Sequence, residues 1–137
     1  MVKLGISVEG ATELGFVKQV LIPYLLEKGI LMIPVSIGGR VSIDSIHPEI
    51  NRMVNTYGYA TTLYDFYGFR KKSADDNKKS LEAKMLAGVK PELKHRVIPY
   101  VQMYEFEGLL FTSPEAIASV LENDKLVKWA QAILKQS

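Results

Sequence analysis

The sequence predicts an α/β fold in which helices flank a central, mostly parallel sheet of four strands. Short apolar runs rich in β-branched residues alternate with stretches whose apolar residues recur every three or four positions. The chain has 137 residues, the size of one domain. Hydrophobic residues make up 47% of it and charged residues 23%, which excludes wholesale disorder. Strands that alternate with helices form βαβ units, whose strands run parallel.

The first part of the chain predicts two strands with a helix between them. Residues 2–8 form a short apolar run, and the helical pattern that follows continues as far as Gly29. Pro23 lies inside this pattern, and we expect it to kink the helix because proline lacks a backbone donor. Residues 30–37 form the second strand, in which Pro34 favours an edge position or a bulge.

The middle of the chain repeats this order. After a loop at 38–40, Asp44 or Ser45 is suited to cap a helix that ends near Gly58. The apolar face of that helix consists of Ile46, Ile50, Met53 and Val54. Residues 59–64, rich in threonine and tyrosine, predict the third strand.

The last part of the chain predicts a loop over 65–77, a helix over 77–86 and a fourth strand over 96–104. Pro99 within this strand again favours an edge or a bulge. Residues 113–115, Ser-Pro-Glu, form a strong helix start, and two short helices are expected after it.

The charge balance and the absence of cysteine exclude several classes of protein. The chain has 17 Lys and Arg against 15 Asp and Glu, a net charge of +2, which excludes a DNA-coating protein and an acidic tail. Without cysteine there is no disulfide, thiolate zinc site or cysteine nucleophile. The sequence has no run of about 18 apolar residues and no signal-peptide layout, so we expect a soluble cytoplasmic protein that does not enter membranes.

Acidic residues fall where three of the predicted strands end. Glu9 follows the first strand, Asp65 follows the third, and Glu105 and Glu107 follow the fourth. Glu13 lies one helical turn beyond Glu9. In a parallel sheet these strand ends meet at one edge, where open α/β folds bind ligands. Carboxylates that close repel one another unless a hard divalent cation such as Mg²⁺ or Mn²⁺ neutralises them.

A simpler interpretation is that each acid caps a helix or is solvated. For one acid alone this is the better explanation, because exposure is normal for carboxylates. Glu9 in particular is placed to favour the N-terminus of the following helix. Because four acids fall at the same place in the predicted geometry, a shared cation site becomes as good an explanation as the simpler interpretation.

Three sequence blocks resemble a known family. Residues 8–13 read V-E-G-A-T-E, residues 61–69 read T-T-L-Y-D-F-Y-G-F, and residues 98–111 read I-P-Y-V-Q-M-Y-E-F-E-G-L-L-F. With the glycines at 38–39 they resemble a Toprim-like family of uncharacterised bacterial proteins, related to the Toprim domain of OLD-type (overcoming lysogenization defect) nucleases. The resemblance implies a Toprim-like three-layer sandwich as one domain over 1–137. Relatives tend to continue further, which leaves open a missing C-terminal extension.

The resemblance also implies roles for the acids. Glu9 would correspond to the Toprim glutamate and Glu13 to the second acid of the OLD-type opening. Asp65 would hold the first place of the Toprim D-x-D motif, with Glu9 and Asp65 as catalytic residues. The sequence departs from the pattern at Tyr67, which stands where the second Asp is expected.

Two glutamates offer a replacement for the missing Asp. Glu105 and Glu107 follow the fourth strand, much as a late acidic pair serves the OLD-type nucleases. By resemblance, the metal ligands would be Glu9, Glu13, Asp65, Glu105 and Glu107. The departure at the second Asp leaves the number of metal ions open.

Two further residues are candidates for substrate binding. Arg40, after the two glycines, would offer a guanidinium to a phosphate, although a Gly-Gly turn with a solvent-exposed arginine is the better explanation. Tyr67 would stack on a base or form a hydrogen bond with a phosphate, and an ordinary half-buried tyrosine is at least as good an explanation. The basic runs 70–72 and 78–79 are a weak nucleic-acid signal, since charge runs are usually solvated.

The sequence therefore predicts an Mg²⁺- or Mn²⁺-dependent nuclease acting on nucleic-acid phosphodiesters. The OLD-type resemblance implies a partner ATPase and defence against foreign DNA. A non-catalytic binding module with the Toprim shape is the main rival, and a small-molecule phosphohydrolase is a third alternative. The sequence does not decide between DNA and RNA as the substrate, nor does it determine the oligomeric state.

Overall fold

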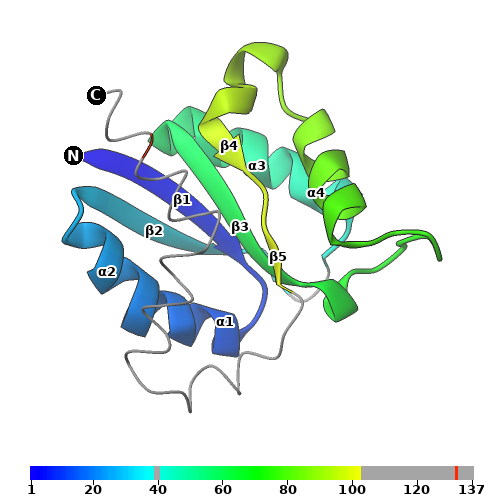
Figure 1. The fold of residues 1–137 in the computed structure, drawn as a ribbon, viewed down its shortest axis with the longest axis horizontal. Helices are drawn as coiled ribbons and strands as arrows, with labels where there is room; N and C mark the ends of the chain where they lie inside the picture. The colour runs from blue at the N-terminus through cyan, green and yellow to red at the C-terminus, as the bar shows by residue number, and fades with distance from the viewer. Residues whose placement is uncertain (39–40, 103–131, 133–137) are drawn as a thin grey trace.

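A parallel sheet forms the centre of the molecule. The computed structural model describes residues 1–38, 41–102 and 132. Its strands lie in the order β2 (Ile30–Ser36), β1 (Val2–Val8), β3 (Tyr59–Asp65) and β4 (Val97–Ile98). A further short strand, β5 (Val101–Gln102), pairs with the same side of β3 as β4 does, nearer the carboxyl end of β3. Every pairing is parallel, and helices lie around the sheet, as Figure 1 shows. This confirms the predicted α/β fold.

The two faces of β1 carry different side chains. Leu4, Ile6 and Val8 alternate along the strand and are buried in one core. Gly5 faces the other way, where a Cβ atom would lie 2.7 Å from Cδ2 of Tyr57. Glycine at this position therefore lets the helix that carries Tyr57 pack close to the sheet.

An irregular helical arm covers the first face. It consists of α1 (Ala11–Phe16), a π-helical turn η1 (Val17–Leu21) and α2 (Ile22–Leu26). The expected disturbance at Pro23 takes the form of this π turn, in which Ile22 donates to the carbonyl of Val17. The arm ends at Leu26, and a turn continues to Gly29, the predicted stop, which has a φ of 84°.

The helix α3 (Ile43–Tyr57) lies against the opposite face and contacts β1 and β3. Its N-cap is Ser42, which accepts a hydrogen bond from the backbone of Ser45. The prediction of Asp44 or Ser45 as the cap was wrong, because three neighbouring residues have side chains that suit a cap. Ser45 completes a capping box, in which its hydroxyl accepts from the Ser42 backbone at 3.0 Å.

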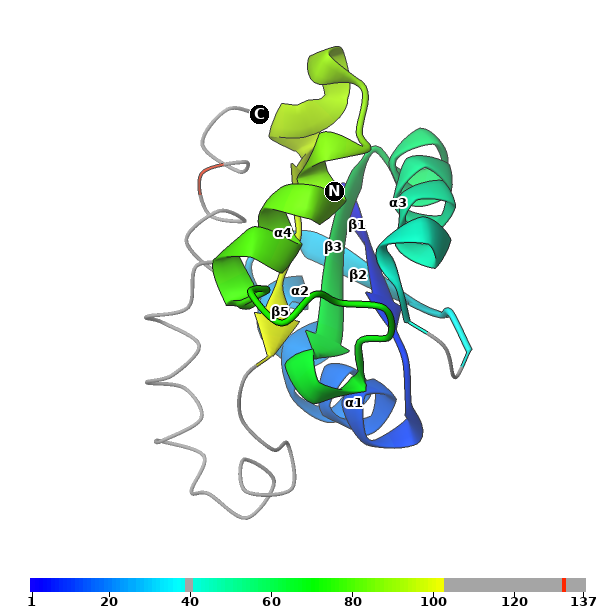
Figure 2. The same ribbon diagram turned by 90° about the vertical axis from the view of Figure 1, so that its right-hand side faces the viewer.

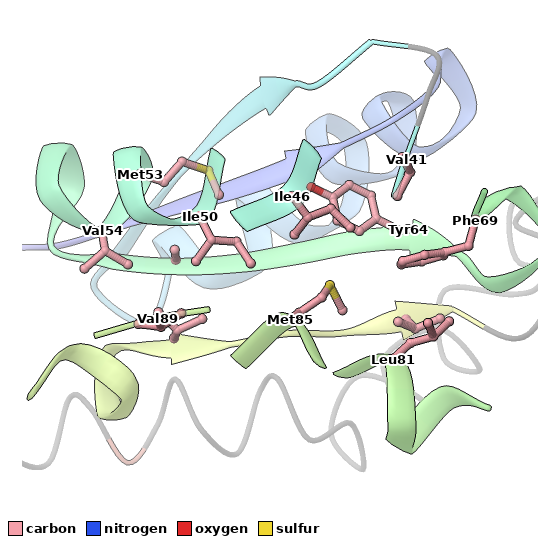
Figure 3. Close-up of a cluster of buried hydrophobic side chains, with 13 residues drawn as sticks. Val41, Ile46, Ile50, Met53, Val54, Tyr64, Phe69, Leu81, Met85 and Val89 are labelled. Atoms are coloured by element: carbon pink, nitrogen blue, oxygen red, sulfur yellow. The ribbon is translucent and has the colours of Figure 1, made fainter. Parts of the chain in front are cut away.

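Helix α4 (Lys78–Ala87) completes this second core. Asn77 caps it by accepting from Ser80, as the predicted start at residue 77 requires. Figure 3 shows side chains of α3 and α4 converging on β3 and on the segment after it. The four apolar residues predicted for the core face of α3 are all buried here: Ile46, Ile50, Met53 and Val54.

The predicted fourth strand is interrupted. A 3-10 helix, η3 (Pro91–Arg96), includes Arg96, and the strand begins only at Val97 and divides into β4 and β5 around Pro99. Side chains of β3 satisfy the backbone at the break. The Thr61 hydroxyl donates to the Ile98 carbonyl at 2.7 Å. The Thr62 hydroxyl accepts a hydrogen bond of 2.8 Å from the backbone nitrogen of Tyr100 and donates one of 2.9 Å to the Tyr100 carbonyl.

Helix α4 supplies polar partners to the outer side of β5. The backbone nitrogen of Val101 donates to Glu82 at 3.0 Å, and its carbonyl accepts from Lys78 Nζ at 2.8 Å. These side chains satisfy groups that a neighbouring strand would otherwise pair with. Figure 2 shows α4 beside β5 in the perpendicular view. None of the helices that the structure describes is long and apolar enough to cross a bilayer.

Candidate functional site

Two of the predicted acids come together at the carboxyl end of the sheet. Glu9 directly follows β1, and Asp65 is the last residue of β3. These strands are hydrogen-bonded neighbours, with Val8 opposite Leu63. The prediction that parallel strands would place both acids at one edge is therefore confirmed. We refer to Glu9, Glu13 and Asp65 as the acidic edge.

The carboxylate of Glu9 packs against the turn that follows β3. A Cβ atom on Gly68 would lie 3.1 Å from Oε2 of Glu9, so glycine leaves the space that this carboxylate occupies. Gly68 belongs to a short 3-10 helix, η2 (Phe66–Gly68). Within the part of the chain that the structure describes, no hydrogen bond or ion pair reaches the Glu9 carboxylate. Contact with η2 therefore holds Glu9 in place without neutralising it.

Four effects act on the protonation of Glu9. Partial burial raises the pKa of the Glu9 carboxyl, and the neighbouring charges of Glu13 and Asp65 raise it further. The positive charge of Arg70 lowers this pKa but does not cancel the other effects. Glu13 and Asp65 therefore lie close enough to destabilise the charged form of Glu9, as expected for a site that attracts a cation.

Glu13 lies in the first turn of α1. A Cβ atom on Gly10 would lie 2.8 Å from Oε2 of Glu13, so this carboxylate folds back towards the start of its own helix. Gly10 is the N-cap, and it has no side chain with which to cap the helix. Glu13 thus stabilises the positive end of α1 while it adds charge near Glu9.

Asp65 has a structural partner of its own. Its Oδ1 accepts a hydrogen bond of 3.1 Å from the backbone nitrogen of Tyr67 and so caps η2. This is the helix-capping role that the simpler interpretation assigned to strand-end acids. The bond occupies one acceptor position, and a carboxylate has about four, so Asp65 retains acceptor capacity for a second partner.

Tyr67 projects from the same turn into solvent. Its side chain is 71% exposed, and its ring packs edge-on against Phe66 at a centroid distance of 5.3 Å. The alternative of an ordinary half-buried tyrosine is therefore wrong. An exposed ring beside the acidic edge suits the predicted stacking on a base, which stays a prediction.

Three predicted site residues lie outside the described residues: Arg40, Glu105 and Glu107. Gln102, the last described residue before the two glutamates, pairs with Asp65. Among the residues that the structure describes, no three His, Cys, Asp or Glu side chains are grouped closely enough to hold a metal ion. Glu9, Glu13 and Asp65 interact electrostatically but do not by themselves form a ligand set.

Arg70 belongs to the site but was not among its predicted residues. An isolated parallel bridge joins Val41 to Phe69, and the Arg70 backbone nitrogen donates to the Val41 carbonyl at 2.8 Å. This bridge fixes the segment after η2 against the start of α3 and brings the charge of Arg70 near Glu9. The sequence signal was the basic run at 70–72, which could not indicate which cation approaches the acids.

The fold and the acidic edge define an α/β protein whose acids meet at the carboxyl ends of parallel strands. The chain belongs to the family described as Domain of unknown function (DUF4276), which matches residues 8–137. No curated protein and no solved structure gives a significant match to the chain. The family description states no activity.

Proposed function

We propose that this protein is a divalent-metal-dependent enzyme that cleaves nucleic-acid phosphodiesters at the acidic edge. The observation that carries the proposal is the position of Glu9 and Asp65 at adjacent strand ends, where partial burial and the charges of Glu13 and Asp65 raise the pKa of Glu9. A fold tolerates such repulsion more readily where a bound cation relieves it. The resemblance to Toprim domains of OLD-type nucleases supports the same assignment.

The donor set fits Mg²⁺ or Mn²⁺ in its chemistry. Both cations prefer carboxylate oxygens, and the acidic edge offers three carboxylates. The described residues lack a complete ligand group. The proposal therefore assigns the remaining oxygens to Glu105 and Glu107, which follow β5 in the sequence. When bound, such a cation supplies Lewis-acid polarisation of the phosphate and lowers the pKa of a coordinated water.

The protein's own side chains would orient the substrate. Glu9 and Asp65 are the proposed catalytic residues, because they lie at adjacent strand ends and correspond by resemblance to the Toprim glutamate and the first acid of the D-x-D motif. Tyr67 offers an exposed ring on which a base can stack. Arg40, after the glycines at 38–39, is the proposed contact to a phosphate. The resemblance extends the proposal to a cytoplasmic role in defence with a partner ATPase, which rests on that resemblance alone.

A non-catalytic binding module is the second candidate. Tyr67 replaces the second acid of the D-x-D pattern, and the described residues do not contain three grouped metal ligands. Both observations favour a protein that keeps the shape and binds a ligand without cleaving it. Activity measurements separate the two candidates.

A plasmid-nicking assay tests the proposal. We expect cleavage that requires Mg²⁺ or Mn²⁺, stops with EDTA, and falls by about 100-fold or more in Glu9→Ala. The matched control is Glu92→Ala, which removes an exposed acid from η3 at the opposite end of the sheet and should leave the rate unchanged. Metal-dependent cleavage that persists at full rate in Glu9→Ala would refute the assignment.

A further inference from the structure

A pocket of about 200 Å³ is lined in part by Arg70, the cation that acts on Glu9 of the acidic edge. The segment after η2, the start of α3 and α4 line it. Four of its lining residues are cationic, and we call them the basic pocket: Arg70, Lys71, Lys72 and Lys84. The pocket is smaller than the roughly 300–1,000 Å³ that drug-sized ligands occupy. It therefore suits a small anionic group rather than a whole nucleotide.

The carboxylates in this pocket only partly balance its cations. Asp76 forms an ion pair of 2.7 Å with Lys84, and this hydrogen bond, together with those from Ser73 and Ser80, lowers the pKa of Asp76. Asp44 is exposed at the first turn of α3. The remaining cations at positions 70–72 outnumber the single carboxylate left to oppose them.

Arg70 and Lys71 are the cations most open to a ligand. Both are exposed, and within the described part of the chain neither side chain forms an ion pair. Lys72 is more constrained, since its Nζ lies 3.5 Å from the carbonyl of Phe69 and 5.1 Å from the ring centroid of Phe66. Arg70 is also the cation that lowers the pKa of Glu9, so it connects the pocket to the acidic edge.

The walls of the pocket are held by the fold rather than by a ligand. The bridge between Val41 and Phe69 buries both residues and fixes the backbone on which the cations lie. Ser42 already caps the N-terminus of α3 by accepting a hydrogen bond from the Ser45 backbone nitrogen. The positive charge comes from side chains on a segment whose position is set by packing.

We propose that the basic pocket binds a phosphate of a nucleic-acid strand, next to the phosphate that lies at the acidic edge. This inference rests on the proposed function for the identity of the strand. Cations that neutralise backbone phosphates supply most of the affinity for nucleic acid and make it depend on salt. The pocket would place the strand along the line from the lysines, past Arg70, to Glu9, and so fix its register without reading its sequence.

Lys71 provides the sharpest test because its backbone has a φ of 60°, a left-handed conformation that asparagine and glycine adopt more readily than lysine. Lys71→Asn therefore removes a charge from the pocket without straining the fold. Lys71→Gly serves as a second variant of the same kind. The matched control is Lys94→Asn, an exposed lysine of η3 at the opposite end of the sheet.

The experiment measures binding of a fluorescent single-stranded oligonucleotide in EDTA, so that cleavage plays no part. We expect both Lys71 variants to bind about three- to tenfold more weakly, and the slope of log affinity against log salt to fall by roughly 0.7. Lys94→Asn should bind like the wild type. Equal affinity and slope in wild type and both Lys71 variants, with thermal melting showing them folded, would overturn the proposal.

Two arms identify the source of the phosphate. Oligonucleotides with and without a 5′-phosphate should lose affinity equally in Lys71→Asn, because internal phosphates are present in both. A loss confined to the 5′-phosphorylated strand would overturn the assignment to an internal phosphate and identify a terminal one. The binding experiment contains EDTA and no metal, so its result does not depend on cleavage. Failure of the proposed nuclease activity in the nicking assay is therefore distinguishable from failure of phosphate binding in the basic pocket.

Discussion

Polar groups inside the sheet have hydrogen-bond partners, whereas a carboxylate at its carboxyl end lies beside groups of like charge. In the interior, the hydroxyl of Tyr64 donates to that of Ser7, and the hydroxyls of Thr61 and Thr62 bond to the interrupted strand. Among the described residues no buried side-chain nitrogen or oxygen lacks a partner. At the acidic edge, in contrast, Glu9 is partly buried beside like charges.

The difference separates residues that serve stability from residues that oppose it. A buried hydroxyl with a partner contributes to the free energy of unfolding, whereas a carboxylate with a raised pKa reduces that free energy at neutral pH. An arrangement that opposes stability at one edge is typical of a functional site. Substitutions at the two places should therefore change stability in opposite directions.

The larger effect is expected in the interior. Tyr64→Phe removes a hydroxyl at a fully buried position and leaves the equally buried Ser7 without this partner. We expect the free energy of unfolding to fall by about 1–2 kcal/mol in urea denaturation. The matched control is Tyr67→Phe, in which the same atom is lost from a side chain that is 71% exposed, and stability should not change. An equal fall in the free energy of unfolding in both variants would show that the hydrogen bond between Tyr64 and Ser7 does not stabilise the protein.

A smaller effect of opposite sign is expected at the acidic edge. Glu9→Gln removes a carboxylate whose pKa is raised by burial and by its acidic neighbours. We expect the metal-free protein to melt about 1–3 °C higher at neutral pH, a modest gain because partial exposure screens the repulsion. Glu92→Gln, at an exposed site, should leave the melting temperature unchanged.

The pH dependence gives this prediction a definite sign. Because the folded state raises the pKa of Glu9, the folded protein holds this proton more tightly than the unfolded chain. The stability of the wild type should therefore fall as the pH rises from the ordinary pKa of Glu9 through its raised value. The advantage of Glu9→Gln should vanish below the ordinary pKa, where Glu9 is protonated in both states. An advantage that persists there would have another cause.

The fold was largely accessible from the sequence because strong patterns had few competitors. Alternating apolar residues and terminal glycines determined the first three strands and α3 to within a residue or two. The position of the α3 cap could not be decided, since Ser42, Asp44 and Ser45 all suit it. Pro99 predicted a disturbance of the last strand, which divides around it. The hydroxyls of Thr61 and Thr62 that bond to the backbone at the break are tertiary contacts, which no local pattern reveals.

The site was accessible only in part. The meeting of Glu9 and Asp65 follows from parallel topology, which the alternation of strands and helices predicts. The approach of Arg70 and the basic pocket depends on the bridge between Val41 and Phe69, two residues far apart in the sequence. Spacing along the chain carries no signal for that contact. The predicted roles of Glu105 and Glu107 stay predictions.

Calorimetric titration of Mn²⁺ into the protein tests the central claim, that the acidic edge binds a divalent cation. Ligation requires the charged carboxylate, so we expect wild-type protein to bind at millimolar metal and to bind more weakly as the pH falls through the raised pKa of Glu9. Glu9→Gln should lose most of this affinity, and Glu92→Gln should retain it. Wild-type protein that gives no binding heat, or Glu9→Gln that binds as tightly as the wild type, would contradict the account.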